Sequence, residues 1–116
     1  MSFIATYNKG FRMKFDNGFS ISVQWGIGNY CEKKNLGATL GDERKEDFWE
    51  SKTAEVAVFD NNNDMLSIGN EEAVIGWLSP DEVAKVISII SSSPQTITIG
   101  KEGHNEIEMK IKSLNL

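Results

Sequence analysis

The sequence predicts an α+β fold, in which an antiparallel sheet of about six or seven short strands is covered on one face by one helix at about residues 80–92. Two patterns lead to this prediction. Apolar and polar residues alternate in several short runs, as they do in strands with one buried face. One later run has its apolar residues at helical spacing and follows a strong helix start. With 116 residues the chain has room for one core, so we expect a single domain over residues 1–116.

The N-terminal part is predicted to begin with a short strand, Ser2–Tyr7, which a turn at residues 8–10 connects to a hairpin. Both arms of this hairpin carry an apolar residue at every second position. These residues are Phe11, Met13 and Phe15 in the first arm, and Phe19, Ile21, Val23 and Trp25 in the second. We expect both sets to lie on the sheet face beneath the helix.

The loop of this hairpin follows from its two apolar sets. Asn17-Gly18 favours a two-residue type I′ turn, but that turn would place the two sets on opposite faces of the sheet. A three-residue loop, with Asp16 and Asn17 in a type I turn and Gly18 in the left-handed conformation, instead places Phe15 opposite Phe19. Because burying each such side chain contributes about 1.5–3 kcal/mol, the sequence predicts the three-residue loop.

Residues 26–52 are predicted to form a long irregular segment, because they contain several glycines, a charge-dense stretch and no sustained periodic run. Irregular segments of this length are uncommon in compact domains and are usually functional or mobile. Phe48 and Trp49 lie among the charged residues of this segment. Since Trp is enriched in binding interfaces, these two residues are candidate anchors for a partner.

Three further strands are predicted before the helix, at Thr53–Asp60, Met65–Ile68 and Ala73–Leu78. The first has apolar residues on both faces, which indicates a central position in the sheet. The turn at 61–64 is rich in Asn and Asp and would make Met65–Ile68 the partner of the first strand. Trp77, beside a glycine and close to the helix, is expected in the core.

The helix has a complete start signal. Ser79 is a favourable N-cap, Pro80 suits the first helical position, and Glu82 completes a capping box. The apolar stripe that follows consists of Val83, Val86, Ile87 and Ile90. Beyond the helix, Gln95–Ile99 and Glu106–Lys112 alternate and are predicted to be two paired strands. Dimerisation is one way to cover the open edge of such a sheet, which makes a homo-oligomer an option for this chain.

The net charge of −5 comes from acidic and basic residues that are interspersed along the chain. Binding to a nucleic-acid backbone would need a basic stripe, so we expect no direct contact of this kind. A single cysteine fits a reducing cytoplasm. The N-terminal residues lack signal-peptide features and no apolar run approaches the ~20 residues that span a bilayer, so we expect a cytoplasmic protein without a membrane segment.

The most site-like stretch is the loop 26–31, together with Gln24 before it. Glycine allows a backbone to approach a ligand closely, and Asn, Tyr and Cys offer an amide, a stacking ring and a thiol. The glycine spacing resembles a dinucleotide fingerprint only superficially, because position 31 is not glycine and no helix start follows, so we expect no cofactor. The residues expected to bind a ligand or partner are Gln24, Gly26, Gly28, Asn29, Tyr30 and Cys31. The alternative is a strand exit with Tyr30 and Cys31 packed in the core.

No catalytic residues are predicted. Cys31 and His104 are the only residues of their types, and no third group is in place to orient them as a nucleophile and a base. A lone Cys is usually buried and a lone His in a turn is usually solvated. The same scarcity argues against a zinc site.

A calcium site is also not predicted, although one spacing invites the comparison. Asp60, Asn62, Asp64 and Glu71 fall at positions typical of a calcium-binding loop, but Met65 occupies the position where that loop needs glycine. Asn and Asp are common in turns because their side chains accept hydrogen bonds from the nearby backbone. The turn is therefore the preferred interpretation, and we expect no metal.

Three blocks of the sequence resemble a family of small proteins encoded in phage and prophage genomes. They are Asn17-Gly18 with the Ser-Val-Gln-Trp-Gly-x-Gly-Asn-Tyr-Cys run at 22–31, the strand at Thr53–Asp60, and the helix entry at Gly76–Val83. The first block is the most specific. The resemblance carries over no catalytic residue.

This resemblance implies an accessory phage protein that is produced in the cytoplasm of a bacterial host. Small accessory phage proteins without catalytic motifs often inhibit a host defence or regulatory system by binding a host protein, and this is the expected function. One alternative is a sponge that sequesters a small nucleotide-like signalling molecule. A second alternative is a thiol-dependent enzyme that uses Cys31.

Overall fold

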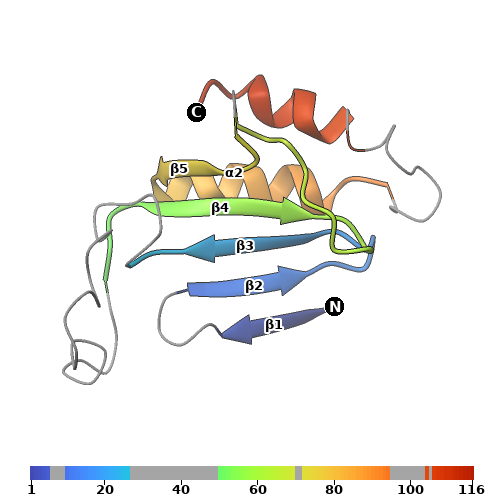
Figure 1. Cartoon of the computed structure of the whole chain (residues 1–116), viewed down its shortest axis with the longest axis horizontal. Coiled ribbons are helices and arrows are strands. Elements are labelled where there is room, and N and C mark those ends of the chain that lie inside the picture. The colour runs from blue at the N-terminus through green and yellow to red at the C-terminus, as the bar shows by residue number, and fades with distance from the viewer. Residues whose placement is uncertain (6–9, 27–49, 70–71, 95–103, 105) are drawn as a thin grey trace.

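The computed structural model describes residues 1–5, 10–26, 50–69, 72–94, 104 and 106–116 (Figure 1). Within these residues the chain forms an antiparallel five-stranded sheet in the order β1-β2-β3-β4-β5. The strands are β1 (Ser2–Ala5), β2 (Gly10–Lys14), β3 (Ser20–Gln24), β4 (Ala54–Phe59) and β5 (Ile75–Leu78). The helices are α2 (Pro80–Ser91) and a C-terminal helix at 106–112. The α+β class is confirmed, but the described residues contain fewer strands and one more helix than predicted.

The three-residue loop of the first hairpin is confirmed. The N–H of Phe15 donates to the carbonyl oxygen of Phe19 (2.9 Å), so these two residues face each other across the loop. Gly18 has a φ of 92°, which only glycine adopts without strain. The register continues along both strands, with Met13 opposite Ile21. Burial of the apolar face therefore outweighs the local preference of Asn-Gly for a tighter turn.

The central position of β4 is confirmed, since it pairs with β3 on one side and β5 on the other. Its register with β5 shifts, because Ala54 pairs with Leu78 while Val56 pairs with Ile75, which leaves an extra residue in β5. Trp77 lies in this irregular stretch with a φ of 60° and is 55% exposed. The predicted core position of Trp77 is therefore wrong. The next residue, Leu78, is buried, and neighbouring strand residues point to opposite faces.

The segment after β4 does not return as a regular strand. Met65 forms only an isolated bridge with Phe59, and the N–H of Leu66 donates to the carbonyl oxygen of Val58 (2.8 Å). Leu66 and Ile68 are nevertheless buried. The segment therefore contributes apolar side chains to the core, while most of the predicted strand pairing at Met65–Ile68 is not formed.

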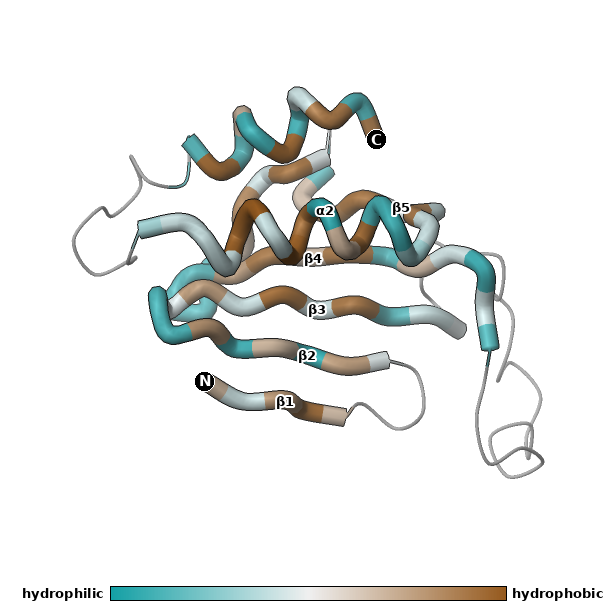
Figure 2. The backbone as a smooth tube through the Cα atoms, turned by 180° about the vertical axis from the view of Figure 1, so that it is seen from behind, coloured by the Kyte–Doolittle hydropathy of each residue, from teal (hydrophilic) through white to brown (hydrophobic). Residues whose placement is uncertain are grey.

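The start of α2 is confirmed in detail. The N–H of Glu82 donates to Ser79 Oγ (3.2 Å), and the N–H of Ser79 donates to Glu82 Oε1 (2.9 Å). The helix packs over β3, β4 and β5 on one face of the sheet. Figure 2 shows α2 in front of β4, with β1 the strand farthest from the helix. The first two strands of the sheet therefore extend beyond the cover that α2 provides.

The predicted C-terminal strand at Glu106–Lys112 is wrong, because residues 106–112 are helical. Ile107 and Ile111 are buried and lie four residues apart, so they share one helix face. Met109 lies between them and is 70% exposed. The alternation of these three residues fitted a strand equally well. The predicted partner strand, Gln95–Ile99, lies outside the described residues.

The buried apolar residues of the described segments form one cluster, to which the sheet and both helices contribute. Phe19, Ile21 and Val23 of the first hairpin belong to it, as do Ile107 and Ile111 of the C-terminal helix. No helix in the described part of the chain is both long enough and apolar enough to cross a membrane.

Candidate binding surface

Gln24 and Gly26 are the predicted binding residues that lie within the described part of the chain. Gln24 ends β3 opposite Glu55, and its Nε2 donates to Ser22 Oγ (3.2 Å) on the sheet face away from α2. Gly26 is buried and has a φ of 110°, so a residue with a side chain would be strained there. The other predicted binding residues, Gly28, Asn29, Tyr30, Cys31, Phe48 and Trp49, lie outside the described residues.

An apolar pocket of about 340 Å³ lies between the first turns of α2 and the neighbouring ends of β3 and β4. Trp25 follows Val23 at strand spacing, so both side chains lie on the α2 side of the sheet. Pro80 and Ala84 of α2 form part of the opposite wall. The described lining consists of Phe11, Val23, Trp25, Ser51, Thr53, Ala54, Leu78, Pro80, Val83, Ala84 and Ile87.

The chemistry of this pocket favours an apolar guest. Its described lining contains no charged side chain, whereas a phosphate or a carboxylate is best held by Arg or Lys. The hydroxyl of Ser51 donates to the carbonyl oxygen of Thr53 (2.7 Å), so this polar group of the lining already has a partner. A volume at the lower end of the ~300–1,000 Å³ range of ligand sites suits a single large apolar side chain or ring.

A second cavity, also about 340 Å³, has basic side chains in its lining, Arg12 and Lys14. The guanidinium of Arg12 lies 4.5 Å from the ring centroid of Phe59. Its Nη2 donates to Ser20 Oγ (3.1 Å) and to Asn63 Oδ1 (3.2 Å). Arg12 thus connects β2 and β3 to the turn after β4. Lys14 is exposed, and the two cations outnumber Asp60, which is also in the described lining, so the cavity favours an anionic group.

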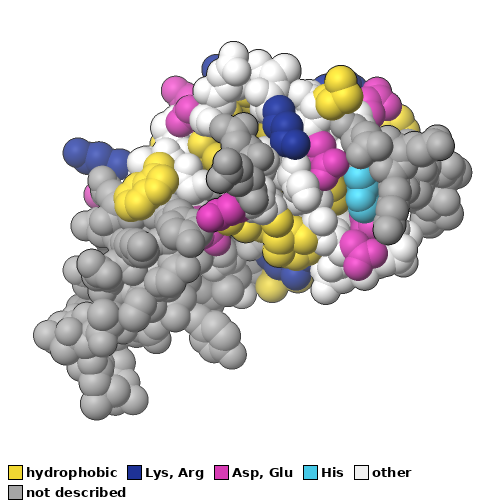
Figure 3. All heavy atoms as spheres, turned by 45° about the horizontal axis from the view of Figure 1, so that its top comes forward, with side chains coloured by type: hydrophobic (Ala, Val, Ile, Leu, Met, Phe, Trp, Pro, Cys, Tyr) yellow, Lys and Arg dark blue, Asp and Glu magenta, His cyan; other side chains and the backbone are white. Residues whose placement is uncertain are grey.

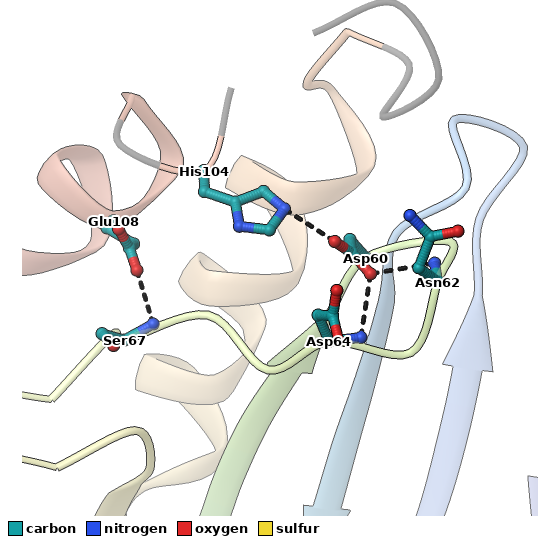
Figure 4. Close-up of polar contacts among 6 residues, drawn as sticks. All are labelled: Asp60, Asn62, Asp64, Ser67, His104 and Glu108. Carbon is teal, nitrogen blue, oxygen red and sulfur yellow. Dashed lines mark hydrogen bonds and ion pairs between the residues drawn. The ribbon is translucent and has the colours of Figure 1, made fainter. Parts of the chain in front are cut away.

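The C-terminal helix is held against the turn after β4 by polar contacts (Figure 4). His104 Nε2 lies 2.9 Å from Asp60 Oδ2. The other carboxylate oxygen, Asp60 Oδ1, accepts hydrogen bonds from the N–H groups of Asn62 and Asp64, both at 2.9 Å. A further contact runs from the N–H of Ser67 to the carboxylate of Glu108.

These contacts correct the expectation that His104 is a solvated turn residue, because its side chain is only 13% exposed and packs near the ring of Phe19. Cys31, with which His104 was compared as a base, lies outside the described residues. The carboxylate of Asp60 is directed at two backbone N–H groups and an imidazole. Within the described segments no group of three or more His, Cys, Asp or Glu side chains is placed to hold a metal ion.

A third cavity, about 630 Å³, lies between residues 68–69 and 72–76 and the C-terminal residues 111–116. Its lining mixes apolar side chains with Glu72, Lys112 and Asn115. Figure 3 shows the molecule with its top turned forward, and acidic, basic and apolar side chains are interspersed on that face. This mixture does not select one class of ligand.

The pocket beside Trp25 was missed in the sequence because its walls come from three separate segments of the chain. Trp25 follows Val23 at strand spacing, and this alternation predicts that both side chains lie on the same face of the sheet. It does not predict a cavity at that face. No protein-family model, curated protein or solved structure matches this chain.

Proposed function

We propose that this chain is a non-enzymatic accessory protein of phage type, which binds a protein of a bacterial host and thereby inhibits a defence or regulatory system. The observation that carries the proposal is the apolar pocket beside Trp25. Apolar side chains that fill such pockets are typical binding hot spots of protein partners, and an aromatic wall adds contact area at little entropic cost. The resemblance to phage-encoded proteins supplies the biological setting.

The pocket is placed where a partner could reach it. It lies beside the C-terminal end of β3, next to Gln24 and Gly26, which were predicted to belong to a binding surface. Ala84 is exposed at its rim and sits on the rigid helix α2. An apolar side chain of a partner would enter between Trp25 and the first turns of α2, and its burial would drive the association.

The test compares two substitutions on the same helix, Ala84→Lys and Ser88→Lys. Both residues are exposed, but only Ala84 lines the pocket. A bacterial protein captured by the wild type would be purified and titrated against each variant by calorimetry. We expect Ala84→Lys to weaken binding by about tenfold or more, because it places a charge at an apolar mouth, and Ser88→Lys to bind as the wild type does.

Two results would contradict the proposal. One is the absence of any captured partner under conditions in which the wild type is folded. The other is a partner that binds wild type and Ala84→Lys equally well. Because both variants place Lys at exposed helix positions, circular dichroism should show equal thermal stability, which separates a binding effect from a folding effect.

A second candidate function is a sponge for a small nucleotide-like signalling molecule. It is favoured by the cavity that Arg12 and Lys14 line, since phosphates bind best to such side chains. Thermal-shift screening against cyclic nucleotides and ADP-ribose derivatives tests it. A stabilisation that is lost in Lys14→Ala would favour the sponge, and a flat screen would remove it.

A further inference from the structure

Among the described residues, β1 forms an open edge of the sheet. It pairs with β2 on one side, and it is the first strand in the sheet order. All four of its residues are exposed, including Phe3 at 79%. Met1, the residue before β1, is 88% exposed. An edge strand with free backbone groups and large exposed apolar side chains is a template for pairing with another strand.

β1 is short, with four residues, but it lacks the charged residues, proline and bulge that protect many other edge strands. Its sequence, Ser-Phe-Ile-Ala, contains no charged residue and no proline. Its register with β2 is continuous from Ser2 to Ala5, so no bulge twists the edge away. A surface of this kind accepts a neutral strand with matching apolar residues, and β1 itself has this composition.

We propose that two copies of the chain associate through antiparallel pairing of their β1 strands, which joins the two sheets into one continuous sheet. The pairing is centred on Phe3, so that Phe3 of each copy lies opposite Phe3 of the other. This interaction is independent of the host partner proposed above, because Phe3 and Ile4 do not line the pocket beside Trp25.

The alternation of side chains between the two faces of the sheet restricts which residues of the two β1 strands can lie opposite each other. Directly opposed residues point to the same face of a sheet, so a two-fold axis normal to the sheet must pair residues of equal parity. Centring on Phe3 pairs Ser2 with Ile4 of the second copy, and Met1 with Ala5. Phe3 lies opposite Met13, which packs against the core that α2 covers. The Phe3 and Met13 side chains of both copies would then form one apolar cluster beyond the cover of α2.

Charge does not oppose this pairing. The N-terminal ammonium groups of the two Met1 residues would be roughly 14 Å apart in the proposed register, from the strand dimensions. The nearest exposed basic side chain is that of Lys14, which lies opposite Ser2 on β2. In the proposed register the two Lys14 residues would be roughly 16 Å apart, from a strand spacing of about 4.8 Å and a rise of about 3.4 Å per residue. This exceeds the Debye length of about 8 Å at physiological ionic strength, so their repulsion is largely screened. Because the edge is short, we expect a weak dimer that forms with rising concentration.

Sedimentation velocity over a wide range of concentration tests the association. The wild type should shift from monomer to dimer as its concentration rises. Phe3→Lys should stay monomeric, because a charge would enter the apolar cluster. The control Met109→Lys changes a similarly exposed apolar residue on the C-terminal helix and should dimerise as the wild type does. A wild type that is monomeric at every concentration would overturn the proposal, and so would a dimer that Phe3→Lys leaves intact.

Disulfide cross-linking tests the register, in a background where Cys31 is replaced by Ser. Directly opposed residues have Cα atoms about 4.5–5.5 Å apart, within disulfide range. Phe3→Cys should therefore form a covalent dimer. Ile4 would be roughly 8 Å from Ile4 of the second copy, from the same strand dimensions, so Ile4→Cys should not cross-link. Efficient cross-linking by Ile4→Cys and not by Phe3→Cys would rule out the Phe3-centred register.

Discussion

Asn17 connects two parts of the fold with a single side chain. It lies in the loop of the first hairpin and is 9% exposed. Its Nδ2 donates to the carbonyl oxygens of Ile90 (2.7 Å) and Ser93 (2.8 Å), at the end of α2, and its Oδ1 accepts from the N–H of Phe19 (3.1 Å). The last carbonyl groups of a helix have no partner within the helix. Asn17 therefore donates to two of the carbonyl groups at the C-terminus of α2 and fixes the hairpin against it.

Asn17→Asp should destabilise the protein although the two side chains have nearly the same shape. The substitution removes both donors and places a negative charge at the negative end of the helix dipole, so we expect a loss of about 2–4 kcal/mol in the free energy of unfolding. Urea denaturation measures it. Asp16→Asn, at the exposed neighbouring position, is the control and should change little. Equal stability of both variants would contradict the capping role.

At the scale of the element, α2 illustrates a helix whose start is encoded locally and whose end is completed by tertiary contact. Ser79, Pro80 and Glu82 form the start within four consecutive positions. Hydrogen bonds from the backbone N–H of Ser79, and then from its side chain, lower the pKa of Glu82 below its ordinary value of 4.5, while desolvation opposes them. At the end of the same helix, Ser92 and Ser93 donate to carbonyl oxygens of the last turn, and Asn17, which is distant in sequence, adds two further hydrogen bonds.

The capping box predicts a pH dependence that Glu82→Gln should reduce. Because the pKa of Glu82 is lowered in the folded state, its stabilising contribution is present above the ordinary value of 4.5 and is lost as the pH falls through the lowered folded-state pKa. The thermal midpoint of the wild type should exceed that of Glu82→Gln near pH 7, and the difference should shrink in acid. A difference that grows on acidification would contradict this assignment.

At the scale of the whole molecule, the C-terminal helix belongs to the same core as the first hairpin. Ile107 and Ile111 are buried in the cluster that contains Phe19, and the contact between Asp60 and His104 lies beside that ring. Truncating the side chain of Ile107 or of Ile111 would open a cavity in the shared core. The two ends of the chain should therefore unfold together.

Ile111→Ala should reduce the free energy of unfolding by about 2–4 kcal/mol, because Ile111 is fully buried and its loss leaves a cavity. Met109→Ala, on the exposed side of the same helix, should change it by less than about 0.5 kcal/mol. Urea denaturation followed by both Trp fluorescence and circular dichroism measures both effects. Transitions that differ between the two probes would show that the C-terminal helix unfolds separately from the sheet.

The sequence by itself determined the elements whose causes are close together in the chain. Alternation and glycine chemistry were sufficient for the loop at Asp16–Gly18, and a capping box was sufficient for the start of α2. Only the tertiary structure decided between helix and strand for residues 106–112, because Ile107 and Ile111 satisfy both periodicities until the surface that buries them is known. It also decided the exposure of Trp77 and the pocket beside Trp25. Burial depends on which distant faces meet, and no local pattern carries that information.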